Sequence, residues 1–191
     1  ATSASDPTSS AGISIIDLEK LAVADVRLPP GSTSVREVAI SPDGKWAYAV
    51  HTLGRFNVPA TQLERGCVNT NALSIGDLAD TRHLATVLLD HPFEGAADPW
   101  GLALSGDGRT AWISLRGVHQ VARVDVAGLH ELLSGKAPER IVPTAYSTGT
   151  KGIWDEVRQS PEKRALLADD LSALHVAGLI ERVPVSGAGP R

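Results

Sequence analysis

Residues 37–50 read EVAISPDGKWAYAV and residues 101–114 read GLALSGDGRTAWIS, so the two segments align without a gap. In both, Asp-Gly stands between two short runs. This dipeptide favours the tight turn of a β-hairpin, because glycine readily adopts positive φ angles. In the first copy Trp46, Tyr48 and Val50 alternate with small alanines, which is the period-2 pattern of a strand with two different faces. Each segment is therefore predicted to be a β-hairpin.

A second motif accompanies these hairpins. Residues 13–18 (ISIIDL) recur as residues 73–78 (LSIGDL) and again as residues 121–126 (VARVDV). An apolar run that ends in an aspartate is typical of a third strand closed by a turn, whose N–H groups the carboxylate accepts. The aspartates expected to have this structural role are Asp17, Asp77 and Asp125.

The two motifs combine into a four-stranded antiparallel unit, with strands a, b, c and d in chain order. Residues 23–28 and 84–89 supply strand d for the earlier units, and residues 180–185 are expected to supply it for the last. A repeated unit of this kind is the blade of a β-propeller. The sequence predicts an all-β chain of about two and a half blades. This is a partial β-propeller, because closed propellers have typically four to eight blades.

The chain divides into four predicted segments. Residues 1–12 form a loose N-terminal arm, and residues 13–126 form the propeller blades. Residues 127–179 form a loop and helix insertion, and residues 180–191 form the last blade strand and the lead-in to a missing blade. The chain stops where the next blade should start, so it is expected to be incomplete by itself.

Two helices are predicted within the insertion. Residues 128–135 form a short one. Ser160, followed by Pro161 and Glu162, has the pattern of a helix N-terminus, and Gly178 is well placed to end that helix. Its apolar stripe is expected to pack on the chain's own domain. The stripe consists of Leu167, Leu171 and Leu174.

The turn SPDGK at residues 41–45, followed by an aromatic-rich strand and then a strand ending in Ile-Asp-Leu, resembles the repeat of bacterial YVTN-type, lactonase-like β-propellers. The resemblance covers roughly residues 13–135. It implies an exported protein, periplasmic or secreted, resembling the propeller part of proteins often linked to c-type haem domains. The chain has no C-x-x-C-H motif, so no covalent cofactor is expected, and any haem belongs to a missing part or a partner.

Composition excludes several classes of function. The chain has 18 Lys and Arg against 22 Asp and Glu and no basic run, so no nucleic-acid partner is expected. No apolar run is long enough for a membrane span. One cysteine, Cys67, excludes an internal disulfide and a Cys-based zinc finger. Motifs for a serine nucleophile, a phosphate loop or a dinucleotide site are missing from the sequence.

Loop length indicates where a binding site would lie. Strands b and c are joined by a short turn in the second complete blade, but by the longer residues 51–72 in the first. Because strand direction alternates, this loop shares a face with residues 91–100, and binding residues concentrate on such loops. His51 is expected to leave strand b at the rim. The candidate ligand- or partner-binding residues are His51, Arg55, Asn69, Asn71, His91 and Asp98.

The chemistry of this predicted site stays open. His51 and His91 are the first candidates for a bound metal ion, since imidazole with carboxylate suits a transition metal, whereas carboxylates and amides alone suit calcium. Alternatively, the polar side chains hydrogen-bond the loop's own backbone. Catalytic residues are not assigned. Trp46 and Trp112 are expected to pack between blades.

Two functions from different classes remain. The first is an exported binding or scaffolding module, a segment of a larger propeller in an electron-transfer or multi-subunit assembly. Its expected partners are the remaining propeller blades or another protein chain, including a cytochrome-type protein. The alternative is a propeller enzyme, lactonase-like or metal-dependent redox, with its site on the long-loop face. Propellers host many activities, so the fold alone does not decide between them.

Overall fold

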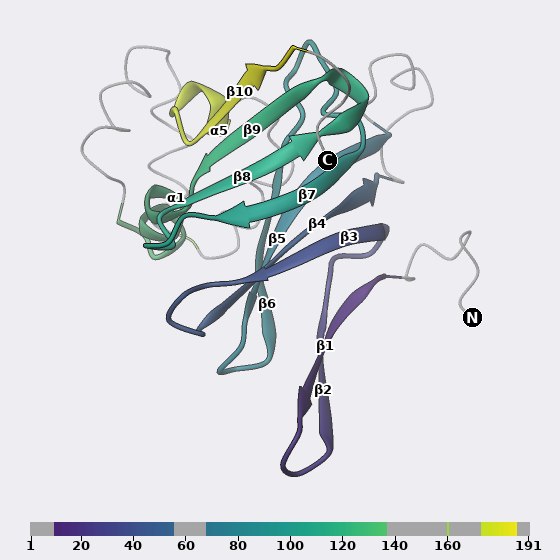
Figure 1. The fold of residues 1–191 in the computed structure, drawn as a ribbon, viewed down its shortest axis with the longest axis vertical. Helices are drawn as coiled ribbons and strands as arrows, with labels where there is room; N and C mark the ends of the chain where they lie inside the picture. Colours follow the sequence, from purple (N-terminus) through teal and green to yellow (C-terminus); the bar gives the residue numbers. More distant parts are fainter. Residues whose placement is uncertain (1–9, 56–67, 137–159, 161–172, 187–191) are drawn as a thin grey trace.

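A computed structural model of the chain describes residues 10–55, 68–136, 160 and 173–186. Within them, two four-stranded antiparallel sheets lie face to face and a two-stranded hairpin lies beside the first (Figure 1). The first sheet has the order β3-β4-β5-β6, and the second has the order β10-β9-β8-β7. These are the predicted a-b-c-d units, so the expectation of about two and a half blades is confirmed.

Strand bounds follow the repeats closely. The hairpin consists of β1 (Gly12–Asp17) and β2 (Ala22–Arg27). The first sheet consists of β3 (Ser32–Ile40), β4 (Trp46–Gly54), β5 (Asn69–Asp77) and β6 (Arg82–Leu88). The second consists of β7 (Pro99–Leu104), β8 (Thr110–Leu115), β9 (Gln120–Asp125) and β10 (Ile180–Pro184). The last strand pairs antiparallel with β9, as predicted for a strand d that follows a long insertion.

The two Asp-Gly turns are built alike. The Ser41 hydroxyl donates to Asp43 Oδ1 at 2.6 Å, and the Ser105 hydroxyl donates to Asp107 Oδ1 at 2.6 Å. These bonds hold the pKa of both carboxyl groups below the usual range. Both glycines take positive φ angles, 70° and 69°. The predicted hairpin turns are confirmed.

The recurring aspartates close the third strands as expected. Asp17 Oδ1 accepts the N–H groups of the two residues that begin the next turn, at 3.0 Å each. Asp77 Oδ1 does the same at 3.1 and 3.2 Å. Asp125 accepts the N–H of Gly128 at 2.9 Å and thereby caps α1 (Val126–Leu133). One sequence position therefore ends three strands, although the last leads into a helix.

Helices are present at the predicted positions within the described residues. α1 corresponds to the short helix expected at residues 128–135, and η2 (Arg116–Val118) is a single 3-10 turn. α5 (Ala173–Val176) lies near the C-terminal end of the helix predicted at 160–178, and Gly178 follows it with φ 69°. Residues 161–172, with two of its three stripe leucines, lie outside the described part.

The core lies between the two four-stranded sheets. Tyr48 and Val50 of β4 and Ile75 of β5 face Ile113 of β8 across it, all at most 1% exposed. Burying each side chain of this size stabilises the fold by about 1.5–3 kcal/mol. Trp46 belongs to the same face and packs on the His130 ring of α1 with the centroids 4.6 Å apart. Trp46 was predicted to pack between blades; it lies on the inner face of the first sheet, but the contact it makes there is with the helix α1.

Trp112 does not pack between blades within the described residues. Its side chain lies on the other face of the β7–β10 sheet and is 43% exposed. Trp100 lies on this face too, and the guanidinium groups of Arg36 and Arg116 lie over its ring. A shallow groove of about 430 Å³ is lined by Glu37, Trp100, Gly101, Leu102, Ala103, Trp112, Ser114 and Val121. This surface is called the open face below.

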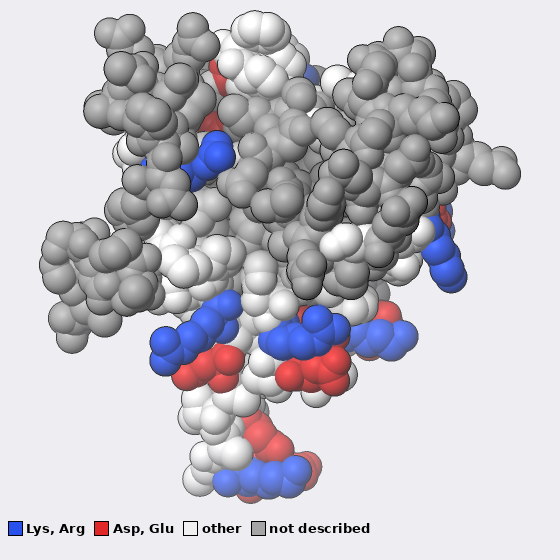
Figure 2. Space-filling view, turned by 180° about the vertical axis from the view of Figure 1, so that it is seen from behind, with Lys and Arg blue, Asp and Glu red and all other residues white. Residues whose placement is uncertain are grey.

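Charges of both signs alternate where the hairpins turn. Figure 2 shows Lys and Arg side chains next to Asp and Glu side chains toward the lower end of the molecule. Ion pairs at these turns include Lys20–Asp17 at 3.5 Å and Lys45–Asp43 at 3.3 Å. Exposed pairs of this kind contribute little to stability, because water and salt screen them. In the described part of the chain, no helix is long and apolar enough to cross a membrane.

Candidate functional site

His51 is a buried strand residue, which corrects the prediction that it leaves strand b at the rim. β4 continues to Gly54 and pairs with residues 69–72 of β5, so part of the predicted loop is strand. His51 lies within this extension and is 0% exposed. Alternation places it on the sheet face opposite Tyr48, because side chains two residues apart share a face.

The nitrogens of His51 are both engaged inside the protein. Its Nδ1 lies 3.1 Å from the carbonyl oxygen of Thr52, which can only accept, so Nδ1 carries the hydrogen. Nε2 therefore accepts from the Ser74 hydroxyl at 2.7 Å. The chain continues from Ser74 to Thr86 at 2.6 Å and from Thr86 to His83 at 2.8 Å. Burial lowers the pKa of both histidines. We interpret this chain as a structural network.

The other residues of the predicted loop have different positions. Asn69 and Asn71 both belong to β5, opposite Gly54 and Thr52 of β4. Asn69 is exposed, whereas Asn71 is 7% exposed. The N–H of Arg55 donates to the carbonyl of Val68 at 2.7 Å, which continues the ladder. Residues 56–67, which include Cys67, lie outside the described residues.

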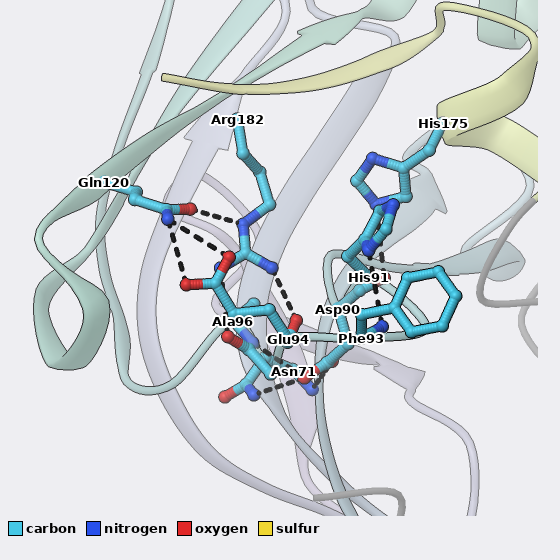
Figure 3. Close-up of polar contacts among 10 residues, drawn as sticks. Asn71, Asp90, His91, Phe93, Glu94, Ala96, Gln120, His175 and Arg182 are labelled. Atoms are coloured by element: carbon cyan, nitrogen blue, oxygen red, sulfur yellow. Dashed lines mark hydrogen bonds and ion pairs between the residues drawn. The ribbon is translucent and has the colours of Figure 1, made fainter. Parts of the chain in front are cut away.

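Asn71 connects the start of β5 to the turn that joins β6 and β7. Asp90 follows β6 and is 4% exposed. Its carboxylate accepts the backbone N–H of Asn71 at 2.5 Å, the Asn71 side-chain N–H at 3.0 Å and the N–H of Ala96 at 2.8 Å (Figure 3). Asn71, near the end of the predicted loop, is therefore joined through Asp90 to the 91–100 segment, whereas residues 56–67 of that loop lie outside the described residues.

Arg182 of β10 holds the same turn from the other side. Its guanidinium donates to the carbonyl oxygens of Glu94 and Gly95 at 2.6 and 3.0 Å. It also donates to Gln120 Oε1 at 2.7 Å and lies 3.3 Å from Glu94 Oε2. The Gln120 amide donates to both Glu94 carboxylate oxygens. The Arg182 side chain is 7% exposed, so this charge is enclosed and compensated by the oxygens of Glu94, Gly95 and Gln120.

The tip of the turn carries an aromatic cluster. His91 and Glu94 exchange backbone hydrogen bonds at 3.0 Å in both directions. Phe93 lies between them and is 92% exposed. The His91 ring centroid lies 5.6 Å from that of Phe93 and 5.2 Å from that of His175, which comes from α5. Phe93 and His91 of the turn and His175 of α5 thus form a row of neighbouring rings.

His91 and His175 each use a ring nitrogen to hold the turn. The N–H of Phe93 donates to His91 Nδ1 at 3.3 Å. His175 Nε2 donates to the carbonyl oxygen of Asp90 at 3.2 Å, and burial lowers the pKa of this histidine. In the part of the chain that the structure describes, no group of three or more His, Cys, Asp and Glu side chains is arranged to hold a metal ion.

Asp98 belongs to a different neighbourhood. It precedes β7 with φ 58° and forms an ion pair with Arg36 at 3.7 Å. Its backbone carbonyl accepts the N–H of Arg116. Of the predicted residues, Asn71 and His91 therefore meet at one turn, whereas His51 and Asp98 lie elsewhere.

Comparison with known proteins shows a distant relationship. No known family profile matches the chain. Over 129 residues the chain is 26% identical to the protein named hydrazine synthase subunit beta of Kuenenia stuttgartiensis, a match covering 68% of the chain and 33% of that protein. The chain is distantly similar to hydrazine synthase subunit beta.

The structural comparison agrees with the sequence comparison. The fold matches a chain of the solved Kuenenia stuttgartiensis hydrazine synthase with a TM-score of 0.68 and 25% identity. This match covers 94% of our chain and 44% of that chain, so it includes most of both four-stranded sheets. The chain thus spans about a third of hydrazine synthase subunit beta and less than half of the solved chain that it matches.

Several residues of the turn were not predicted from the sequence. Asp90 directly follows strand d, and its position at a strand end is the signal that marks it. Arg182 and Gln120 carry no such signal, because their contacts with the turn are far apart in sequence. His175 lies in the helix predicted to end at Gly178, and nothing in the surrounding sequence marks it as a site residue. Phe93 is one of only two phenylalanines, and its place in a polar loop was the available sign.

Proposed function

We propose that this chain is a scaffold in a multi-subunit enzyme assembly, where its blades bind other polypeptide segments. The observation that carries the proposal is the similarity in both sequence and fold to a protein named as a subunit of hydrazine synthase. Propellers host many activities, so fold similarity alone would not support it. The alternative of a metal-dependent enzyme is less favoured, because His51 and His91 each use ring nitrogens within the protein.

The repeat supports a specific docking surface. In the first sheet, Tyr48, Val50, Leu73 and Ile75 form the face that packs on the second sheet. The aligned positions in the second sheet lie on its open face. They are Trp112, Ser114, Val121 and Arg123. A surface equivalent by repeat to a buried sheet face is best matched by another sheet of the same repeat.

The occupant that we propose for the open face is therefore a third four-stranded blade. Trp112 and Trp100 would supply the large apolar contact area, as aromatic side chains do in interfaces. Packing a further sheet there would also cover Val183, which is 41% exposed. The solved hydrazine synthase chain extends well beyond the part that matches ours, which agrees with further blades.

We further propose that the assembly is exported, periplasmic or secreted, and that a cytochrome-type protein is among its partners. The support is the resemblance of the repeat to exported YVTN-type propellers linked to c-type haem domains. Such a partner would hold the haem, since the chain has a single cysteine and no attachment motif.

The test is native mass spectrometry of the protein isolated from its source. The proposal expects a stoichiometric complex with at least one other polypeptide, with the chain exported from the cytoplasm. Recovery of the whole protein as a monomer with a stoichiometric metal ion would instead support the enzyme alternative and contradict the scaffold.

A variant pair tests the open face. Trp112→Glu would bury a charge in the proposed blade contact, so the yield of the folded whole protein should fall at least tenfold. Arg109→Glu changes charge on an exposed hairpin turn of the same sheet and should leave the yield unchanged. Equal yields for the two variants would exclude a blade on this face.

A further inference from the structure

Phe93 is an apolar side chain that the fold holds out in solvent. It is the most exposed large hydrophobic residue of the described chain, at 92%. Burying a phenylalanine side chain is favourable because it removes a large apolar area from water, and the free chain forgoes that stabilisation here. The residue is also aromatic, the type enriched among the few residues that dominate the affinity of protein interfaces.

The turn that carries Phe93 is fixed at its beginning, middle and end. Asp90 binds N–H groups on both sides of it, and Arg182 binds the two carbonyls that follow Phe93 by one and two residues. Ala96, at the end, is 0% exposed. A side chain presented on such a turn loses little conformational freedom on binding, and this preorganisation favours affinity.

We propose that Phe93 is the anchor of a protein-docking site, a rigid apolar knob that inserts into an apolar pocket on another subunit. His91 and His175 form the adjoining contact surface. This inference rests on the proposed scaffold function and names where one partner binds. It concerns a different surface from the open face, because the turn connects the two four-stranded sheets at one end.

The charges around the knob define the partner's chemistry. Glu94 is paired with Arg182 and bonded by Gln120, so the turn presents little unpaired charge. His175 stays uncharged near neutral pH, because burial lowers its pKa. The matching pocket is therefore apolar and of low charge, with a polar rim able to bond imidazole. A nucleic acid needs a basic surface and does not fit this turn.

The test places the photo-reactive residue p-benzoylphenylalanine at position 93 of the full chain, produced in its source cells. The control places it at position 109, an exposed residue on the hairpin turn at the other end of β7. We expect a cross-link at 93 to one defined polypeptide of the isolated complex and no such cross-link at 109. Equal cross-linking at the two positions would overturn the proposal.

Binding measurements with the cross-linked subunit complete the test. Phe93→Ser should weaken the Kd at least tenfold, whereas Phe93→Leu should change it about threefold and leave the melting temperature unchanged. A change below twofold for Phe93→Ser would overturn the docking site while the scaffold function stands. If the unmodified chain binds no other polypeptide, the scaffold function itself fails. If the chain binds phosphatidylcholine vesicles and this binding depends on Phe93, the residue contacts a lipid surface and the proposed protein pocket is wrong.

Discussion

The carboxylate of Asp90 binds Asn71 through two hydrogen bonds, one to its backbone N–H at 2.5 Å and one to its side-chain N–H at 3.0 Å. Through this pair the third strand of the first blade fixes the connection to the second blade. Because both residues are almost fully buried, these bonds are protected from competition with water.

Replacing this carboxylate should loosen the turn. Asp90→Asn exchanges one acceptor oxygen for a donor that faces other donors, so we expect a loss of roughly 2–3 kcal/mol in the free energy of unfolding. Urea denaturation measures it. Asp98→Asn is the matched control, because its ion pair is half exposed and asparagine tolerates its positive φ. That variant should change stability by less than about 0.5 kcal/mol, and equal losses would contradict this account.

Arg182 should not be replaceable by lysine. Lysine keeps the charge but lacks the planar fork that reaches two carbonyls and Gln120 together. Arg182→Lys should therefore speed hydrogen exchange of the Glu94 and Ala96 amides. Arg123→Lys changes an exposed, 4.0 Å ion pair and should leave these amides unaffected. Full protection in Arg182→Lys would show that the fork does not hold the turn.

The buried histidines should make the fold sensitive to mild acid. Burial lowers the pKa of His51 and His83 in the folded state below the ordinary value of about 6.5. The unfolded chain therefore binds these protons first, so stability is present above pH 6.5 and is lost as the pH falls through the lowered pKa values.

Unfolding free energies at pH 7.5 and 5.5 check this, since the carboxylates titrate mostly below that window. His51→Gln should reduce the difference between the two pH values. His119→Asn, at an exposed position with φ 54°, should leave it unchanged. If both variants keep the full difference, the pH dependence arises from other groups, including His130 and His175.

Residues at equivalent positions of the two blades should differ in their effect on the chain by itself. Tyr48→Ala removes a ring that is 1% exposed and should cost about 3–5 kcal/mol. Trp112→Ala removes a larger ring that is 43% exposed and should cost less than about 1 kcal/mol. Thermal and urea unfolding measure both. A large loss for Trp112→Ala would mean that the open face is already covered.

The two turn glycines should also differ. Both have positive φ, so alanine at either should cost about 1 kcal/mol through backbone strain. A Cβ at Gly44 meets nothing within 4 Å, whereas one at Gly108 would lie 2.8 Å from Pro42 Cδ. Gly108→Ala should therefore lower the melting temperature more than Gly44→Ala. Equal effects would show that Pro42 moves aside without cost.

The strand order was predictable because it depends on short local sequence patterns, and because these patterns occur in both blades. The Asp-Gly turns, the period-2 alternation and the aspartates that close the third strands each act within a few residues. The strand β10 could also be predicted, although a long insertion precedes it. Each earlier blade ends in an apolar fourth strand, so the last blade was expected to have one too. Trp46 could be assigned to the inner face because it alternates with small alanines and shares its face with Tyr48 and Val50.

The site was less predictable, since its contacts join distant parts of the chain. His51 was misplaced because β4 and β5 pair beyond the repeated motif, and the repeat gives no sign of where pairing stops. An isolated arginine such as Arg182 is usually a solvent-exposed side chain. Its role depends on carbonyls 87 and 88 residues earlier in the chain, which no local pattern encodes.

The insertion between β9 and β10 has a consequence for the order of folding. Strands β7, β8 and β9 can zip up as neighbouring hairpins, whereas β10 must close a loop that contains residues 126–179. Loop closure over that separation costs about 2 kcal/mol more entropy than over a four-residue turn. Pairing of β10 with β9 is therefore expected to follow the pairing of β7, β8 and β9. Because Arg182 belongs to β10, its bonds to the turn around Phe93 form only when this last strand pairs.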